Sequence, residues 1–404
     1  MSTSLLYHGF GIRGYRYVKT EYVEGKVIFR VEQPRERLRC AACESQNVVL
    51  RGRNERLFRH VPIGGKQVWI QFAVPRVGCQ DCGCVRQVKL TFADPRRRYT
   101  RALARYVLEL SRHMTIKHVA EHLGVSWDTV KEIQKTYLQR HYARPALKHL
   151  RKLAIDEIAT RKGHVYMTVV LDLETGVVVF VGDGKGADSL LPFWKRLRAS
   201  RARIEAVAID MSEAYIKAVE THVPEADLVF DRFHIVKLLN DKLTQLRREL
   251  YREAKDKLHK DVLKGTRWLL LKHPENLDES RDEKARLEEA LHLNSSLSTA
   301  YYLKDDLRQL WEQPHRTAAR NFVTSWYSRA IQSGIRVLQQ FARSLAGGLF
   351  GIINWFRHPI STGPLEGVNN KIKTMKRQAY GFRDHEFFKL KIYALHETKY
   401  ALVG

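Results

Sequence analysis

The pattern of apolar positions divides the second part of the chain into a sheet and a helical segment. Between residues 153 and 231, short β-rich runs alternate with amphipathic stretches. We predict strands at 153–158, 164–173, 177–182, 204–210 and 227–231, with helices at about 187–200 and 213–221. From 236 to 351 the apolar spacing is helical throughout. The pattern therefore predicts a mixed sheet that carries an all-α insertion.

The pattern between Thr115 and Leu138 predicts a helix-turn-helix. Apolar residues mark a first helix, Gly124 permits a turn, and Ser126 is placed to cap a second helix. The early positions of the second helix would face a DNA major groove: Trp127, Asp128, Thr129 and Lys131. Any pair of antiparallel helices shares this periodicity, so the pattern leaves a purely structural hairpin open.

The charge balance favours a polyanionic partner. The 404 residues include 70 Lys and Arg against 44 Asp and Glu, a net charge of +26. Arginines cluster just before the helix-turn-helix, and they form either a phosphate-contacting arm or a solvated linker face: Arg96, Arg97, Arg98 and Arg101. This composition points to nucleic acid before an anionic membrane surface.

The beginning of the chain lacks the long apolar core of a signal peptide. No run reaches the roughly 18 apolar residues that a membrane-spanning helix requires. We therefore expect a cytoplasmic protein with no membrane partner.

All five cysteines lie in the first quarter of the chain, in two Cys-x-x-Cys pairs and one extra thiol. Four thiolates form the tetrahedral ligand set that zinc prefers, which predicts a structural Zn²⁺ site: Cys40, Cys43, Cys79 and Cys82. Cys84 is an alternative to Cys82 as the fourth ligand, and His60 is also available. The other interpretation is a group of reduced, buried cysteines without metal.

Acids stand at the ends of three predicted strands. Asp156 ends LAID, Asp210 ends IEAVAID and Asp231 ends VFD, while Glu366 lies in the first turn of a late helix. An acid at the end of an apolar strand costs desolvation energy unless a cation or a hydrogen-bond donor meets it. Glu157, beside Asp156, should point to the opposite face of the sheet.

A convergent carboxylate cluster in a basic, DNA-binding chain predicts hard divalent cations. We expect two Mg²⁺ ions at this site, with Mn²⁺ as the alternative, since both carboxylates and phosphates are hard oxygen ligands. Two such ions suit phosphodiester chemistry, because they activate a nucleophile and stabilise the leaving oxygen.

On these motifs the chain resembles the ISL-three family of bacterial insertion-sequence transposases. The resemblance implies an RNase H-like DDE catalytic domain, with Asp156 of LAIDEIA, Asp210 of VAIDMSEAY and Glu366 of STGPLEGVNNKIK as its three acids. Asp156 would then bridge both metals, and each of the other two acids would complete one side. DRFH resembles the Asp-x-x-His element of several DDE groups, which makes Asp231 and His234 accessory candidates.

The helix that follows Glu366 is rich in polar and basic residues. Some of them would contact DNA phosphates and others would only solvate the helix: Asn370, Lys371, Lys373 and Arg377. The expected partner is double-stranded DNA, both the element ends and the target. We also expect a homodimer, because two element ends must be handled together.

Four domains are expected. A zinc-binding DNA-recognition module covers 1–93, a helix-turn-helix domain 94–145, an RNase H-like catalytic domain 146–235 and 352–404, and the helical insertion 236–351. The leading hypothesis is a transposase that binds terminal inverted repeats and cleaves and rejoins DNA at the bacterial nucleoid. Two alternatives stay open: a DNA-binding regulator with an inactive catalytic domain, and a structure-specific nuclease or resolvase.

Overall fold

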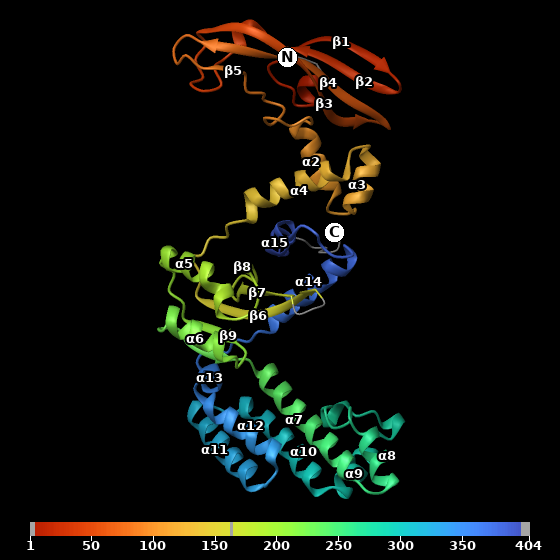
Figure 1. Ribbon diagram of the computed structural model, residues 1–404, viewed down its shortest axis with the longest axis vertical. Helices are drawn as coiled ribbons and strands as arrows, with labels where there is room; N and C mark the ends of the chain where they lie inside the picture. Colours follow the sequence, from red (N-terminus) through yellow and green to blue (C-terminus); the bar gives the residue numbers. More distant parts are fainter. Residues whose placement is uncertain (1–4, 162–164, 397–404) are drawn as a thin grey trace. The chain divides into compact units, whose positions relative to one another are not determined.

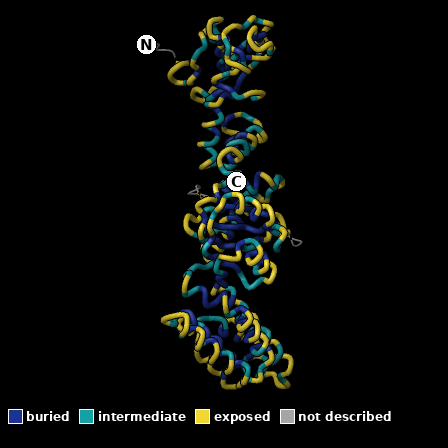
Figure 2. Tube along the Cα trace, turned by 90° about the vertical axis from the view of Figure 1, so that its left-hand side faces the viewer, coloured by how far each residue is buried: buried dark blue, intermediate teal, exposed yellow. Residues whose placement is uncertain are grey.

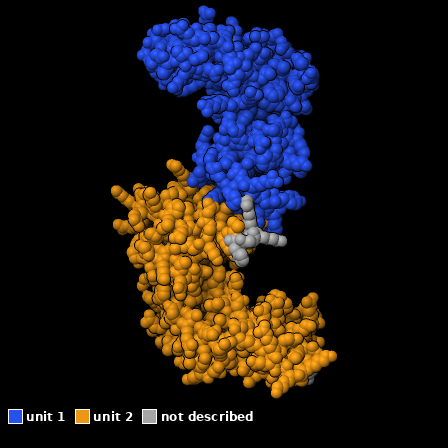
Figure 3. Space-filling model, viewed as in Figure 1, with its two compact units in different colours: residues 1–143, 374–390, 398–404 blue, residues 144–373, 391–397 orange. Residues whose placement is uncertain are grey.

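The computed structural model describes residues 5–161 and 165–396. Two compact units divide the chain (Figure 3). Most of unit 1 consists of residues 1–143 and 374–390, and unit 2 consists of residues 144–373 and 391–397. The sequence expectation kept 352–404 together, whereas contacts within the structure group 374–390 with the helix-turn-helix. Part of the hairpin turn expected at 160–163 lies outside the described residues.

Unit 1 begins with a five-stranded sheet (Figure 1). Its strands are β1 (Arg16–Val23), β2 (Lys26–Glu32), β3 (Val48–Ile63), β4 (Lys66–Cys79) and β5 (Val85–Gln87), preceded by the short helix α1 (Leu5–His8). They run in the order β1-β2-β4-β3, and β5 also pairs with β4. The long β3–β4 hairpin dominates this sheet, because alternate residues of β4, from Val68 to Val74, are buried in one core.

Three helices follow the sheet in unit 1: α2 (Arg101–Leu110), α3 (Ile116–Leu123) and α4 (Trp127–Tyr142). Thr115 caps α3 and Ser126 caps α4. Each hydroxyl oxygen accepts a hydrogen bond from the backbone N–H three residues further along the chain. Gly124 lies between them at φ 60°, a left-handed conformation that glycine adopts without strain. The predicted helix-turn-helix is present, with α3 and α4 in contact through buried apolar residues.

Unit 2 contains the predicted mixed sheet in the order β10-β9-β6-β7-β8. Its strands are β6 (Lys152–Arg161), β7 (Val165–Asp172), β8 (Val178–Asp183), β9 (Ala206–Ile209) and β10 (Asp227–Phe230). The first three strands are antiparallel, and β6, β9 and β10 are parallel. Helix α5 (Leu191–Ser200) connects β8 to β9, and α6 (Glu213–His222) connects β9 to β10. Most residues of these strands are buried, and Figure 2 shows how burial varies along the chain.

Helices alone fill the inserted segment of unit 2. They are α7 (Arg232–Glu253), α8 (Lys257–Gly265), α9 (Glu283–Leu293), α10 (Ser295–Arg308), α11 (Arg316–Gln332), α12 (Arg336–Gly347) and α13 (Leu349–Ile353). Apolar residues of these helices and of the sheet belong to one continuous core. Gly351 lies against Phe230, where a Cβ would come within 2.6 Å of the ring, so only glycine lets α13 approach β10 so closely.

The α/β class, the mixed sheet and the helical insertion are therefore confirmed. The chain returns from the insertion through α14 (Gly363–Gln378) and α15 (His385–Tyr393), each of which begins in one unit and ends in the other. No helix within the described ranges combines the length and the apolar character that crossing a bilayer demands.

Candidate metal and DNA-binding sites

The register of the parallel strands in unit 2 brings three acids to the same end of the sheet. Ala154 pairs with Ala208, so Asp156 and Asp210 each lie two residues further along neighbouring strands. Phe230 pairs with Ile209, which places Asp231 opposite Asp210. Because side chains alternate between faces with a period of two, Asp156 and Asp210 project from the same face of the sheet.

Asp156 is held by two donors. One carboxylate oxygen accepts from the backbone N–H of Glu157 at 2.7 Å, and the other accepts from Nδ2 of Asn369 at 2.9 Å. Burial raises the pKa of Asp156, and the charge of nearby Asp210 raises it further. A cation at this position would relieve both effects.

Asn369 ties α14 to β6. Its side chain is buried, and its Oδ1 has no hydrogen-bond partner among the described residues. The sequence interpretation assigned residues near Glu366 to DNA phosphates and missed this role. The available signal was the spacing: Asn369 follows Glu366 by three residues, so both lie on one face of the helix.

Glu366 is exposed in the first turn of α14, where its backbone N–H donates to the Thr362 carbonyl at 2.8 Å. The hydrogen bond from Asn369 to Asp156 brings this helix alongside β6. Asp156, Asp210 and Glu366 do not form a group whose ligand atoms all lie within 4.8 Å of one another; within the described part of the chain, the four cysteines form such a group.

The buried Asp231 pairs with the half-buried His234 close enough to Asp156 and Asp210 for their charges to interact. His234 Nδ1 is 3.1 Å from Oδ2 of Asp231, whose Oδ1 accepts from the Thr362 N–H at 3.3 Å. Burial opposes ionisation of Asp231, yet the hydrogen bonds from His234 and Thr362 lower its pKa below the ordinary value. The hydrogen bond with Asp231 raises the pKa of His234, and the charges of Asp156 and Asp210 add to this effect.

Glu157 points away from these acids, as predicted from strand alternation. Its Oε1 accepts a 2.7 Å hydrogen bond from the hydroxyl of Tyr215, a buried residue of α6. Asp156 was expected at the end of a strand but lies in the middle of β6, just beyond the residues that pair with β9. The possible metal ligands here are carboxylate and amide oxygens of Asp156, Asp210 and Asn369, with Glu366 exposed on the same helix as Asn369. Hard divalent cations prefer such ligands, so these residues fit a metal.

In unit 1 the cysteines of the two pairs come together. Sγ of Cys40 lies 3.5 Å from Sγ of Cys82, and Sγ of Cys43 lies 3.5 Å from Sγ of Cys79. Backbone N–H groups of Cys43 and Ala42 lower the pKa of the Cys40 thiol to about 6, which favours the thiolate that zinc binds. The four thiols lie within 4.8 Å of one another and match the ligand set of a structural zinc ion, so they fit such an ion.

The two other candidate zinc ligands lie outside this group. The Cys84 thiol is not in this group, but its backbone supports the group: the carbonyl accepts from the Cys79 N–H at 3.0 Å, and the N–H donates to the Cys82 thiol. His60 is fully buried in the sheet, with Nδ1 2.7 Å from the Thr100 hydroxyl that caps α2. Burial and the charge of Arg59 lower the pKa of His60 to about 4. His60 is therefore a neutral core residue.

The predicted DNA-contacting residues of α4 differ in their surroundings. Trp127 and Asp128 are exposed, while the hydroxyl of Thr129 lies 2.8 Å from that of Ser126. Lys131 Nζ lies 5.5 Å from the centre of the Trp127 ring and 3.0 Å from a carboxylate oxygen of Asp384. Lys131 thus already has an anionic partner within unit 1.

The arginine cluster is divided in the same way. Arg97 pairs with Glu132, and Arg101 pairs with Asp94 at 2.8 Å. Arg96 and Arg98 are exposed, and Arg96 has a left-handed φ of 63°. On α14 the four predicted phosphate contacts are all exposed: Asn370, Lys371, Lys373 and Arg377.

Two acids of the segment after α14 cover the basic face of α4. Asp384 pairs with Lys131 and also with Lys135, at 3.0 and 3.1 Å. Glu386 pairs with Lys135 at 2.6 Å and accepts from Gln139 Nε2 at 2.8 Å. Lys131, Lys135 and Gln139 recur every four residues on one face of α4, so a ligand at that face would have to displace these acids.

An Asp384→Asn, Glu386→Gln double variant is expected to bind duplex DNA several-fold more tightly. Asn keeps the cap that Asp384 offers to the Phe387 N–H, while Lys131 and Lys135 lose their carboxylate partners. If both lysines then reach phosphates, the salt dependence should steepen by about two in log-log slope. Fluorescence anisotropy titrations at several salt concentrations measure both effects.

The control for this variant removes the same charge from α2 and α3. Glu109 and Glu121 form exposed pairs with Arg112 and Lys117. A Glu109→Gln, Glu121→Gln variant should change affinity only through net charge. If the Asp384 variant binds DNA more weakly than this control, the segment supports α4 and does not screen it.

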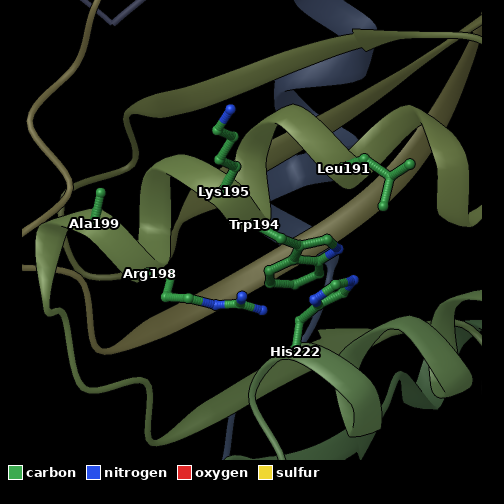
Figure 4. Close-up of a pocket in the computed structure, with 6 residues that line it drawn as sticks. All are labelled: Leu191, Trp194, Lys195, Arg198, Ala199 and His222. Carbon is green, nitrogen blue, oxygen red and sulfur yellow. The ribbon is translucent and has the colours of Figure 1, made fainter.

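A separate cavity of about 360 Å³ lies between α5 and α6 (Figure 4). The Trp194 and His222 rings stack there, with centroids 5.4 Å apart, and Arg198 reaches towards them. None of the residues that line this cavity is a predicted acid or zinc ligand. The candidate chemistry therefore lies at the strand ends of the same unit.

Comparison with known proteins identifies the same three segments. Residues 153–392 match a family model described as "Transposase", of the DDE type in family ISL3. Residues 88–138 match the "Helix-turn-helix domain of transposase family ISL3". Residues 36–82 match the "zinc-finger of transposase IS204/IS1001/IS1096/IS1165", a range that contains Cys82 and excludes Cys84.

Whole-chain relatives agree with these matches. The chain is 35% identical over 397 residues to the transposase for insertion sequence element IS1001 of Bordetella parapertussis, covering 95% of this chain and 96% of the relative. It is 27% identical over 385 residues to the transposase for IS1557 of Mycobacterium tuberculosis, covering 89% and 86%. The relatives match over most of their length, and the three matched segments follow one another in the chain. This chain therefore belongs to the ISL3 family of DDE transposases.

Proposed function

We propose that this DNA transposase binds the terminal inverted repeats of its own element and catalyses metal-dependent cleavage and strand transfer with Asp156, Asp210 and Glu366. The observation that carries the assignment is the parallel register of β6 and β9, which puts Asp156 and Asp210 side by side at one end of the sheet. The hydrogen bond from Asn369 to Asp156 brings α14, and with it Glu366, to the same end.

These residues would hold two divalent ions, Mg²⁺ or Mn²⁺, through carboxylate oxygens. Bound metal supplies activation of the attacking water or 3′-hydroxyl and stabilisation of the leaving oxygen. Asn369 orients Asp156, because it donates to one carboxylate oxygen while the Glu157 N–H donates to the other. The two hydrogen bonds together fix the plane of the carboxylate. Asp231 and His234 are accessory: they connect the start of α7 to the Thr362 backbone just before α14.

We assign Cys40, Cys43, Cys79 and Cys82 to the zinc ion of unit 1. The start of α4 and the exposed arginines before α2 would contact DNA, with Arg96, Arg98 and Trp127 as the accessible residues. A homodimer acting at the bacterial nucleoid is the expected form, since two ends of one element must be cut and joined together.

A cleavage assay tests this function. Labelled duplexes carrying the element's terminal repeat, or unrelated DNA of the same length, are incubated with the protein and Mg²⁺. Repeat-specific nicking that chelator abolishes is the expected result. Equal cutting of both duplexes would indicate a structure-specific nuclease instead, and repeat binding without metal-dependent nicking would indicate a DNA-binding regulator.

A further inference from the structure

Unit 1 contains a polar groove of about 740 Å³ between the sheet and the helix-turn-helix. The β3 edge and Trp69 of β4 form one side of this groove. Its other side consists of Arg98 and Tyr99, which precede α2, and the turn that starts α4. The zinc-binding sheet and the predicted recognition helix therefore share one concave surface.

The wall between these sides is built from backbone hydrogen bonds. The Arg59 N–H donates to the Arg98 carbonyl at 2.8 Å, and the Thr100 N–H donates to the Arg59 carbonyl at 3.0 Å. Residues 98–100 thus run along β3 like a short added strand. This pairing fixes the exposed side chain of Arg98 on the rim of the groove.

Arg59 is a buried cation in this groove. It is 4% exposed, its Nη1 donates to the carbonyls of Val68 at 3.0 Å and His60 at 3.4 Å, and its Nη2 donates to the Leu123 carbonyl at 2.7 Å. None of these acceptors is a carboxylate, and its Nε has no partner within the described part of the chain. A buried charge without a counter-ion is costly, so the groove favours an anion.

Further positive potential comes from neighbouring groups. Arg56 packs over the Phe58 ring and donates to the Arg97 carbonyl at 2.7 Å, so its charge also lacks a carboxylate partner there. The capped start of α4, at Ser126 and Thr129, adds the positive end of a sixteen-residue helix. The acid in the lining, Glu55, lies 3.5 Å from Arg30 and accepts from Gln71.

We propose that this groove seats the sugar-phosphate backbone of the DNA strand that borders the major groove entered by α4. The inference rests on the proposed DNA recognition and extends it to the β3–β4 hairpin, which would act as a second DNA-contacting element. A backbone ligand fits because donors and helix starts bind phosphate oxygens without reading base identity. The groove also adjoins the first turn of α4, where Trp127 and Asp128 are free to meet base edges.

Arg98→Ala tests the groove with little risk to the fold. The exposed Arg98 side chain takes no part in the hydrogen bonds described here, which use its backbone carbonyl. We expect affinity for terminal-repeat DNA and for unrelated duplex to fall by the same factor, on the order of 10-fold at low salt, with the log-log salt slope reduced by about one. The matched control is Arg86→Ala, an exposed arginine on β5 outside the groove, which should stay close to wild type.

Replacing one charged phosphate of the DNA by a neutral group identifies the phosphate that Arg98 contacts. Duplexes with a single methylphosphonate at successive positions are titrated against wild type and Arg98→Ala. One position should weaken wild-type binding and leave the variant unaffected, because the contact is already lost. If Arg98→Ala binds like wild type, or changes the preference between sequences, the groove proposal is overturned alone; if wild type binds no duplex at all, the proposed function fails with it.

Discussion

An Asp156→Asn variant is expected to bind terminal-repeat DNA like wild type and to cleave it at least about 10³-fold more slowly. Such a loss corresponds to roughly 4 kcal/mol of transition-state stabilisation, a reasonable cost for removing the acid that would bridge two metal ions. Asn has nearly the same shape and keeps one of the two hydrogen bonds, either from Glu157 or from Asn369. The sheet should therefore fold normally.

The neighbouring acid provides a matched control. Glu157→Gln also neutralises a carboxylate on β6, but on the opposite face, where its oxygen can still accept from Tyr215. Cleavage by this variant should stay within a few-fold of wild type. Binding of Mn²⁺, followed by electron paramagnetic resonance, should be lost in Asp156→Asn and retained in Glu157→Gln. Undiminished cleavage by Asp156→Asn would remove Asp156 from the catalytic site.

The strand and helix pattern predicted most of the catalytic unit, because burial imposes a local signal. Continuous apolar runs such as those before Asp156 and Asp210 are typical of strands buried on both faces, and residues 153–155 of β6 and 206–209 of β9 are all buried. The ends of these runs located the two acids. Their adjacency depends on the strand order β9-β6, which the sequence pattern does not specify, because β7, β8 and α5 lie between these two strands in the chain.

Long-range pairings carried no such local signal. No strand was predicted before Cys40, although β1 and β2 both precede it, and β1 is largely exposed, so its residues lack the alternation of a half-buried strand. Contacts of Asn369 with Asp156 and of Asp384 with Lys131 join residues more than 200 positions apart. Polar partners at that distance depend on tertiary packing, which periodicity along the chain does not encode.

The choice between Cys82 and Cys84 shows the same limit. Both follow Cys79 within five residues, so spacing alone left them as alternatives. The turn after β4 resolves them, because it uses the Cys84 carbonyl to bind the Cys79 N–H and directs the Cys82 thiol towards Cys40. Geometry of a tight turn, rather than composition, selects the fourth thiol.

Cys82→Ser is accordingly expected to lose bound zinc, whereas Cys84→Ser should retain one zinc ion per chain. A serine hydroxyl is a poor substitute for a thiolate, so zinc affinity should fall by more than the roughly 100-fold that loss of a ligand's supporting hydrogen bond causes. Elemental analysis of the purified full-length variants measures the zinc content, and thermal melting reports the stability of unit 1.

Loss of zinc should also weaken DNA binding. The cysteine cluster joins the segment before β3 to the end of β4, so it anchors the long hairpin whose β3 edge lines the groove beside α4. Zinc binding supplies folding free energy to such a module, and its removal should free the hairpin. Cys84→Ser is the matched control, since it removes one thiol two residues away. Zinc retained by Cys82→Ser and lost by Cys84→Ser would reverse the ligand assignment.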